Sequence, residues 1–258
     1  MVYSFNESKL ASVWSGFSFK WYGALLRDRD MLNAAWLSLK LAFFSATGAV
    51  VLGTLASLVM TRMRYFRSRT LFGALITAPL VMPEVILGLS LLLLFVSMGN
   101  ALNGLGIGQF QPKGVITLWI AHVTFTLAFV TVVISSRMSE LDKSLEEAAM
   151  DLGANRVKVF FQITLPIIAP ALVSGWLLAF TLSLDDVVIS SFVSGPGSTT
   201  LPIKVFSSVR LGLNPKINAL ATIMVSIVAL FAVIGWWWMR REERRRQRDM
   251  QLALQDNG

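Results

Sequence analysis

The sequence has 258 residues, of which 55% are hydrophobic and 15% charged, with a formal net charge of +8. Soluble domains of this length carry about 25% charged residues, so the composition argues against a soluble globular protein. The absence of cysteine excludes disulfides and thiolate metal sites, and the single histidine, His122, excludes a cluster of histidine ligands.

Several apolar runs are long enough to cross a bilayer, which requires roughly 20 residues of helix. The two longest need tilt, a kink or ends outside the membrane. We therefore predict an all-α, polytopic bundle of transmembrane helices. In chain order, the five predicted spans lie at about 34–60, 71–97, 115–136, 165–193 and 217–239.

Basic residues mark the segments on one side of these spans. Arginines fill 61–70, basic residues recur through 137–164, and six arginines follow the fifth span. The positive-inside rule therefore places these segments in the cytoplasm. The tail at 240–258 is interpreted as a topology anchor at an anionic leaflet rather than a nucleic-acid-binding arm.

Five spans with a cytoplasmic C-terminus leave residues 1–33 on the external face. This segment has no charged-then-apolar pattern of a signal peptide. We expect one further span ahead of Met1, absent from this sequence, to carry the segment across the membrane.

Between the third and fourth spans the sequence becomes polar. Leu141, Leu145 and Leu152 recur at helical spacing, which predicts a short amphipathic helix. Gly153 is placed to end that helix in a left-handed conformation. Asn155 can then cap a second short helix.

The start of this amphipathic helix has two interpretations. Ser144 with Glu147 forms a possible capping box, and Ser139 with Asp142 fits as well. The segment could be a plain solvated connector, but its apolar face and tight turn favour docking into a groove of a cytoplasmic partner.

Three acids lie within predicted spans: Glu84 near the midplane, and Asp185 and Asp186 towards the outer end. A charge at the bilayer centre costs at least about 2.5 kcal/mol, so it normally faces a wet cavity or a partner. Because all three side chains are acidic, they favour a pathway for an organic cation. The alternative is that they are protonated or hydrogen-bonded residues that only pack the bundle. Adjacent helical residues point about 100° apart, so one of the paired aspartates can instead bind backbone or a neighbouring span.

Two other intramembrane side chains invite a functional interpretation. Trp176 could stack on an alkylammonium group, although simple packing explains it as well. His122 is interpreted as a hydrogen-bonded interior residue rather than a ligand.

Some activities lack their sequence signals. No G-x-x-x-x-G-K-[ST] phosphate loop occurs, so we do not expect this chain to hydrolyse ATP or to be an enzyme. A stand-alone secondary transporter or channel for organic cations remains an alternative, but the internal inverted repeats it would need are not visible.

The stretch "EEAAMDLGANRVKVFFQITLP" at 146–166 resembles the EAA loop of type I ABC-importer permeases. Three other stretches, at 78–95, 180–202 and 205–222, resemble the polyamine branch of that family, most closely the second permease of putrescine importers. The loop residues that the resemblance assigns to ATPase coupling are Glu146, Glu147, Ala148, Ala149, Gly153 and Pro166.

The resemblance implies a MetI-like transmembrane domain over 34–239, with a coupling loop at 140–166, in a bacterial inner membrane. It implies an ATPase dimer that binds ATP and Mg²⁺, a second permease, a heterodimer with it, and a periplasmic polyamine-binding protein. It implies no cofactor or metal on this chain. Polyamine transport would then use Glu84, Asp185, Asp186 and Trp176 as pathway residues, and a permease for a different substrate is the alternative within the family.

Overall fold

The computed structural model describes residues 2–8, 14–63, 67–106, 110–211 and 215–226, with 229, 233 and 237. The chain divides into two compact units, one formed by 1–29 with 208–258 and the other by 30–207. The described residues form helices and no strand, which confirms the predicted all-α class.

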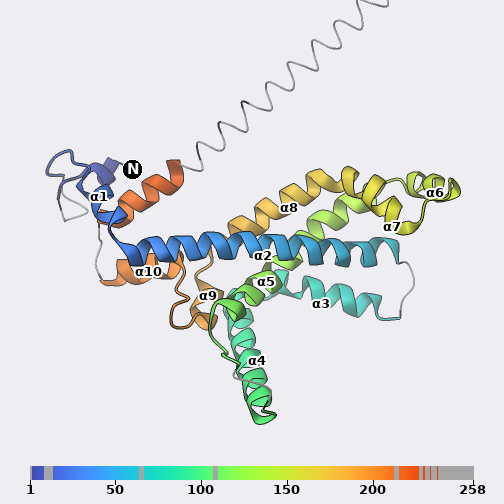
Figure 1. Cartoon of the computed structure of the whole chain (residues 1–258), viewed down its shortest axis with the longest axis horizontal. Coiled ribbons are helices and arrows are strands. Elements are labelled where there is room, and N and C mark those ends of the chain that lie inside the picture. The colour runs from blue at the N-terminus through green and yellow to red at the C-terminus, as the bar shows by residue number, and fades with distance from the viewer. Residues whose placement is uncertain are drawn as a thin grey trace, which may run out of the picture. The chain divides into compact units, whose positions relative to one another are not determined.

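The smaller unit contains a 3₁₀ turn at Val2–Phe5 and the helix α1 at Lys20–Leu26. The Trp21 Nε1–H donates to the Asn6 carbonyl at 2.7 Å, which ties the turn to α1. The larger unit is built from helices, of which the first and last extend slightly beyond its limits (Figure 1). They are α2 (Arg29–Arg62), α3 (Arg69–Val81), α4 (Glu84–Gly104), α5 (Val115–Glu140), α6 (Lys143–Asp151), α7 (Arg156–Val159), a π-helix (Phe160–Thr164), α8 (Leu165–Asp185), α9 (Val188–Val193) and α10 (Leu201–Leu211).

Four helices among the described residues are long and apolar enough to cross a membrane. They are Arg29–Arg62, Glu84–Gly104, Val115–Glu140 and the continuous helix Arg156–Asp185. The predicted spans 34–60 and 115–136 lie inside the first and third of these. The predicted span 217–239 is described at 217–226, 229, 233 and 237, all helical, and the tail 240–258 lies outside the described residues.

The prediction of one span over 71–97 is wrong. Helix α3 ends at Val81, Met82 is extended with ψ 134°, and α4 begins at Glu84 after Pro83. The residue before a proline is pushed out of the helical region by the proline ring, which explains a break at Met82. In Figure 1, α4 turns away from α3 after this break.

The fourth span ends earlier than the predicted 165–193. Helix α8 ends at Asp185, Asp186 is extended with ψ 122°, and α9 starts two residues later. The capping contacts of Asp186, described below, account for this second break.

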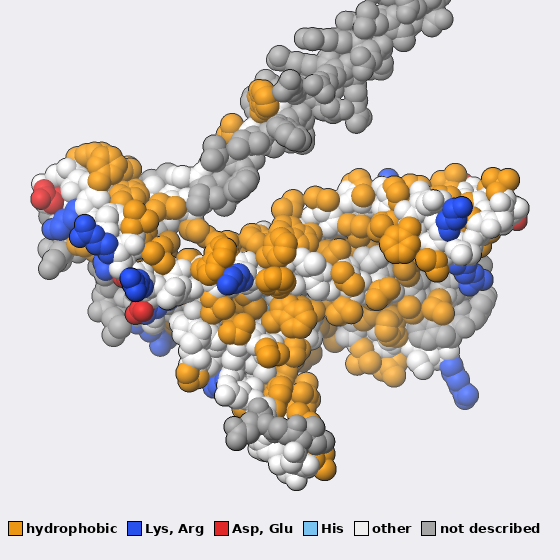
Figure 2. Space-filling model, viewed as in Figure 1, with side chains coloured by type: hydrophobic (Ala, Val, Ile, Leu, Met, Phe, Trp, Pro, Cys, Tyr) orange, Lys and Arg blue, Asp and Glu red, His pale blue; other side chains and the backbone are white. Residues whose placement is uncertain are grey.

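Helix α5 forms the centre of the larger unit. Its Val130 side chain lies opposite Gly53 of α2 and Gly175 of α8, where added Cβ atoms would be 2.9 and 3.5 Å from Val130 Cγ1. Glycines and the fully buried alanines of α2 allow such close approach between helices, as is usual in membrane bundles. Figure 2 shows hydrophobic side chains over most of the middle of this unit, with Lys and Arg gathered near α6, α7 and the start of α3.

Helix α4 meets α9 at Gly88. A Cβ added there would lie 2.7 Å from Phe192 Cδ2 and 3.3 Å from Ile189 Cα. Because such overpacking costs about 1–3 kcal/mol, we expect Gly88→Ala to lower the melting temperature of the purified protein. Gly104→Ala in the same helix is the control, since among the described residues no atom outside its own helix backbone and its chain neighbours lies within 4 Å of its added Cβ. Equal melting temperatures for the two variants would contradict the close contact.

Candidate coupling loop and translocation residues

Helix α6 starts at its own acidic cap. Asp142 is extended, and its side chain accepts a hydrogen bond from the Ser144 backbone N–H at 3.0 Å. Neither predicted capping box is therefore present, because Asp142 rather than Ser144 or Ser139 occupies the N-cap. The backbone N–H of Ser144, followed by its side chain, holds the pKa of Asp142 below its ordinary value. The ionised Asp142 cap therefore stabilises α6 fully at pH values above the ordinary carboxyl pKa. This contribution is lost as the pH falls through the lowered pKa of Asp142.

The turn after α6 is left-handed at Gly153, as predicted, with φ +87°. The Gly153 N–H donates to Met150 O at 2.9 Å and the Ala154 N–H to Ala149 O at 3.0 Å, which closes the end of the helix. Asn155 then accepts from the Lys158 N–H at 2.8 Å, so the predicted cap of the second short helix is also confirmed.

The chain next passes through a π-helical turn into α8. Residues Phe160–Thr164 form this wider turn, and the N–H of Leu165 donates to the carbonyl of Phe160. Pro166 follows as the second residue of α8. Single π turns of this kind inside helices are frequent at functional sites.

The loop presents an apolar surface to its surroundings. Leu152 is 90% exposed, and Glu147 and Ala148 are also exposed. Further exposed apolar side chains of the same segment are Leu145, Met150, Val157 and Phe161. Contiguous apolar side chains on a solvent-facing loop are typical of a docking surface for another protein.

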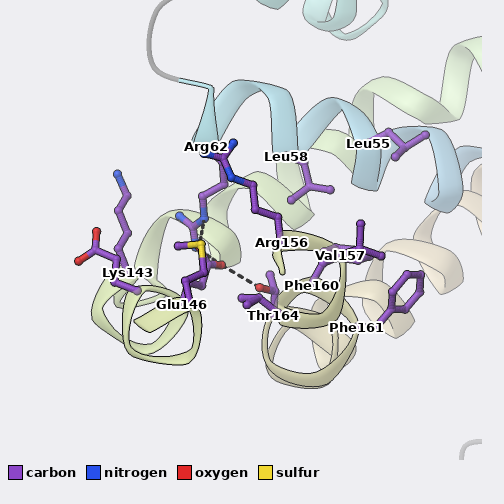
Figure 3. Close-up of a pocket in the computed structure, with 13 residues that line it drawn as sticks. Leu55, Leu58, Arg62, Lys143, Glu146, Arg156, Val157, Phe160, Phe161 and Thr164 are labelled. Carbon is purple, nitrogen blue, oxygen red and sulfur yellow. Dashed lines mark hydrogen bonds and ion pairs between the residues drawn. The ribbon is translucent and has the colours of Figure 1, made fainter. Parts of the chain in front are cut away.

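A groove of about 600 Å³ opens at this surface and shares Glu147, Met150, Val157 and Phe161 with it (Figure 3). Leu55, Leu58 and Arg62 of α2 form one wall. The other walls come from α6 and from the segment 156–164. Glu146 points into the groove and contacts Arg62 and Thr164 across it. Sequence reasoning missed both partners.

The predicted pathway residues lie in different surroundings. Glu84 is the first residue of α4 and Asp185 the last residue of α8, and both are exposed. Within the described residues, neither carboxylate has an ion pair or a hydrogen bond. Trp176 is held by neighbours: its Nε1–H donates to Thr47 Oγ1 at 3.1 Å, and its ring stacks on Phe180.

Asp186 is buried, unlike Asp185. Its Oδ1 accepts from the Ile189 N–H at 3.1 Å and its Oδ2 from the Ser190 N–H at 2.8 Å. Its Oδ2 also lies 3.4 Å from His122 Nε2. Of the two adjacent aspartates, Asp186 therefore caps α9, and Asp185 is the one whose charge is accessible.

His122 of α5 is a hydrogen-bonded interior residue, as predicted. Its Nδ1 lies 2.6 Å from Ser183 Oγ and its Nε2 lies 2.9 Å from Ser190 Oγ. The imidazole thus joins α5 to α8 and α9. Sequence reasoning missed both serines, although Ser183 and Ser190, three and four residues from Asp186, were a possible signal.

We expect His122→Ala to destabilise the bundle. The substitution leaves two buried serine hydroxyls without their partner, which costs about 1–3 kcal/mol. Thermal unfolding of the purified protein measures the effect. The control is Thr124→Val in the same helix, since within the described ranges the Thr124 hydroxyl donates only to Ile120 O of its own helix. A His122→Ala protein as stable as this control would contradict the role of the network.

Comparison with known proteins extends over nearly the whole chain. A family described as "Binding-protein-dependent transport system inner membrane component" matches residues 49–248. The putrescine transport system permease protein PotI of Escherichia coli K12 is 59% identical over 98% of this chain and 88% of that protein. The spermidine/putrescine transport system permease protein PotC of the same strain is 40% identical over 91% of this chain and 84% of that protein.

Solved structures share the fold at lower identity. A bacterial ABC transporter that imports alginate matches with a TM-score of 0.63 and 17% identity, over 90% of this chain and 85% of that one. The methionine ABC transporter MetNI matches with a TM-score of 0.62 and 17% identity, over 85% and 96%. Both the family match and the fold point to a multi-pass membrane protein. The chain therefore belongs to the family of inner-membrane components of binding-protein-dependent transport systems.

Proposed function

We propose that this chain is one permease subunit of an ATP-driven polyamine importer, with putrescine as its substrate. The observation that carries the proposal is the 59% identity to the putrescine permease PotI over 98% of the chain. The exposed apolar surface of 140–166 supports coupling to a separate ATPase subunit through this loop.

The proposed mechanism is alternating access. This chain and a second permease enclose one pathway, and a periplasmic polyamine-binding protein delivers the substrate to it. Two ATPase subunits, which bind ATP and Mg²⁺, close on the coupling loops from the cytoplasm, where the C-terminus of this chain also lies. ATP can drive the change only if it stabilises one of the two states more than the other.

The proposed pathway uses four residues in three different roles: Glu84, Asp185, Asp186 and Trp176. The exposed carboxylates of Glu84 and Asp185 supply negative charge to a diammonium substrate. Asp186 acts by holding α9 in place. Trp176 supports the wall through its contacts with Thr47 and Phe180.

Complementation tests the proposal. An E. coli strain that lacks PotI and PotC is given this chain, and uptake of labelled putrescine is measured. We expect uptake to return and to require the ATPase of the system, with excess unlabelled putrescine but not an amino acid competing. Uptake that persists without the ATPase would indicate a stand-alone transporter, and the absence of uptake by a properly inserted chain would refute the polyamine assignment.

A further inference from the structure

The two adjacent glutamates of the coupling loop have different surroundings. Glu147 is exposed, whereas the Glu146 side chain is 15% exposed. Glu146 Oε1 accepts from Arg62 Nη2 at 3.0 Å and from Thr164 Oγ1 at 2.8 Å, and Oε2 lies 2.9 Å from Arg62 Nε. One carboxylate therefore holds two partners within this chain (Figure 3).

The three residues come from three different elements. Arg62 is the last residue of α2, Glu146 lies in α6, and Thr164 ends the π-helix that leads into α8. Arg62 thus ends one membrane-spanning helix, Arg29–Arg62, and Thr164 lies within another, Arg156–Asp185, directly before α8. A displacement of α6 would therefore be transmitted to both of these helices through the Glu146 side chain.

The backbone alone holds α6 weakly. Before α6, Leu141 and Asp142 are both extended, with ψ 125° and 122°. After α6, the chain turns at Gly153. Since neither junction is a continuous helix, side-chain contacts have to set the position of α6 relative to α2 and α8.

A second ion pair close to α6 in the sequence, between Arg137 and Glu140, differs from the Arg62–Glu146 pair in its exposure. Arg137 and Glu140 form an ion pair at 3.1 Å, but their side chains are 48% and 64% exposed. Exposed pairs of this kind contribute about 0–1 kcal/mol. The Arg62 and Glu146 side chains are 18% and 15% exposed and share a charge-assisted hydrogen bond, a stronger class of contact.

We propose that Glu146 is a positioning residue that clamps the coupling helix to α2 and α8 through Arg62 and Thr164. Glu147, by contrast, belongs to the surface that meets the ATPase. This division of labour rests on the proposed function of the loop. It means that ATPase binding and the transmission of its movement depend on different, adjacent carboxylates.

The test uses the assembled importer in proteoliposomes, with Glu146→Gln, Arg62→Gln and Thr164→Val compared. We measure the ATPase that copurifies and the polyamine molecules transported per ATP hydrolysed. We expect ATPase to copurify at the native level while transport per ATP falls about 5- to 10-fold, a usual size for coupling between sites. The variant Arg137→Gln, which breaks the exposed pair from a position outside the loop 140–166, should keep the native ratio.

Charge exchange separates a direct contact from a general structural effect. Arg62→Glu and Glu146→Arg should each lower transport per ATP, and the double exchange should restore part of it. Native ratios in Glu146→Gln, Arg62→Gln and Thr164→Val would overturn the clamp. Loss of copurifying ATPase in Glu146→Gln, equal to that in Glu147→Gln, would also overturn it by placing Glu146 on the docking surface.

Three variants distinguish failure of the clamp from misfolding and from failure of the proposed function. If Glu146→Gln does not accumulate, Thr164→Val probes the same carboxylate oxygen without changing a charge, and a native ratio there would overturn the clamp. If instead the loop does not couple to an ATPase at all, Glu147→Gln and Gly153→Val would also leave copurification and transport unchanged. That pattern would refute the proposed function rather than the clamp.

Discussion

Gly153→Val is expected to lower polyamine transport and substrate-stimulated ATP hydrolysis about tenfold or more, with normal insertion of the permease. Gly153 has φ +87°, and in the described part of the chain no atom beyond its two chain neighbours lies within 4 Å of an added Cβ. The cost is therefore one of backbone conformation rather than crowding. A left-handed L-residue costs roughly 1–2 kcal/mol, and a β-branched side chain resists this region further.

Gly153→Asn is the matched control for this prediction. Asparagine tolerates the left-handed region better than other non-glycine residues, so this variant should retain most of the stimulated hydrolysis. Hydrolysis is measured with purified ATPase and normalised to the permease present. Native stimulation in Gly153→Val would show that the turn is not needed for docking.

Glu84→Gln and Asp185→Asn are expected to lower uptake per inserted permease by about 5- to 150-fold, which corresponds to about 1–3 kcal/mol for a lost charge-assisted contact. Both carboxylates are exposed and lack an ion pair within the described residues. Their charge is therefore available to a dication, and neither substitution removes a contact within the chain.

Asp186→Asn provides the comparison. Its carboxylate accepts two backbone N–H bonds and lies beside His122, so its loss should lower the amount of folded permease. Quantitative immunoblotting alongside labelled putrescine uptake separates the two effects. Normal uptake per inserted permease in both Glu84→Gln and Asp185→Asn would contradict an acidic pathway.

Local signals in the sequence were sufficient for the turn of the coupling loop. Gly153 and Asn155 act on atoms within five residues, so residue type and spacing predict their conformations. The helix start was misjudged because Ser139, Asp142 and Ser144 are all acceptable caps. The structure selects Asp142 because α5 continues to Glu140 and leaves Ser139 inside a helix.

Features that depend on distant parts of the chain were not predictable. Pro83 disfavours a helical conformation at Met82, but local sequence does not determine whether the helix bends or breaks there. The end of α8 depends on how Asp186 is used by α9 and by His122. The partner of Glu146 is 84 residues away, at Arg62. Hydrophobic periodicity identifies neither kind of pairing.

The π-helical turn at Phe160–Thr164 fixes the rotational phase between the coupling loop and α8. A π turn amounts to one residue more than an α-helical path needs, and each helical residue turns the chain by about 100°. The five residues of this turn therefore carry the chain around the axis about as far as four residues of an α-helix would. Deleting Gln162 would let the helix run regularly with the coupling loop facing nearly its present direction, whereas deleting a residue inside α8 would rotate everything before it by about 100° around the helix axis. The loop sequence would be intact in both variants, but only the deletion inside α8 would turn the loop to face another direction, so the π turn tolerates the loss of one residue better than α8 does.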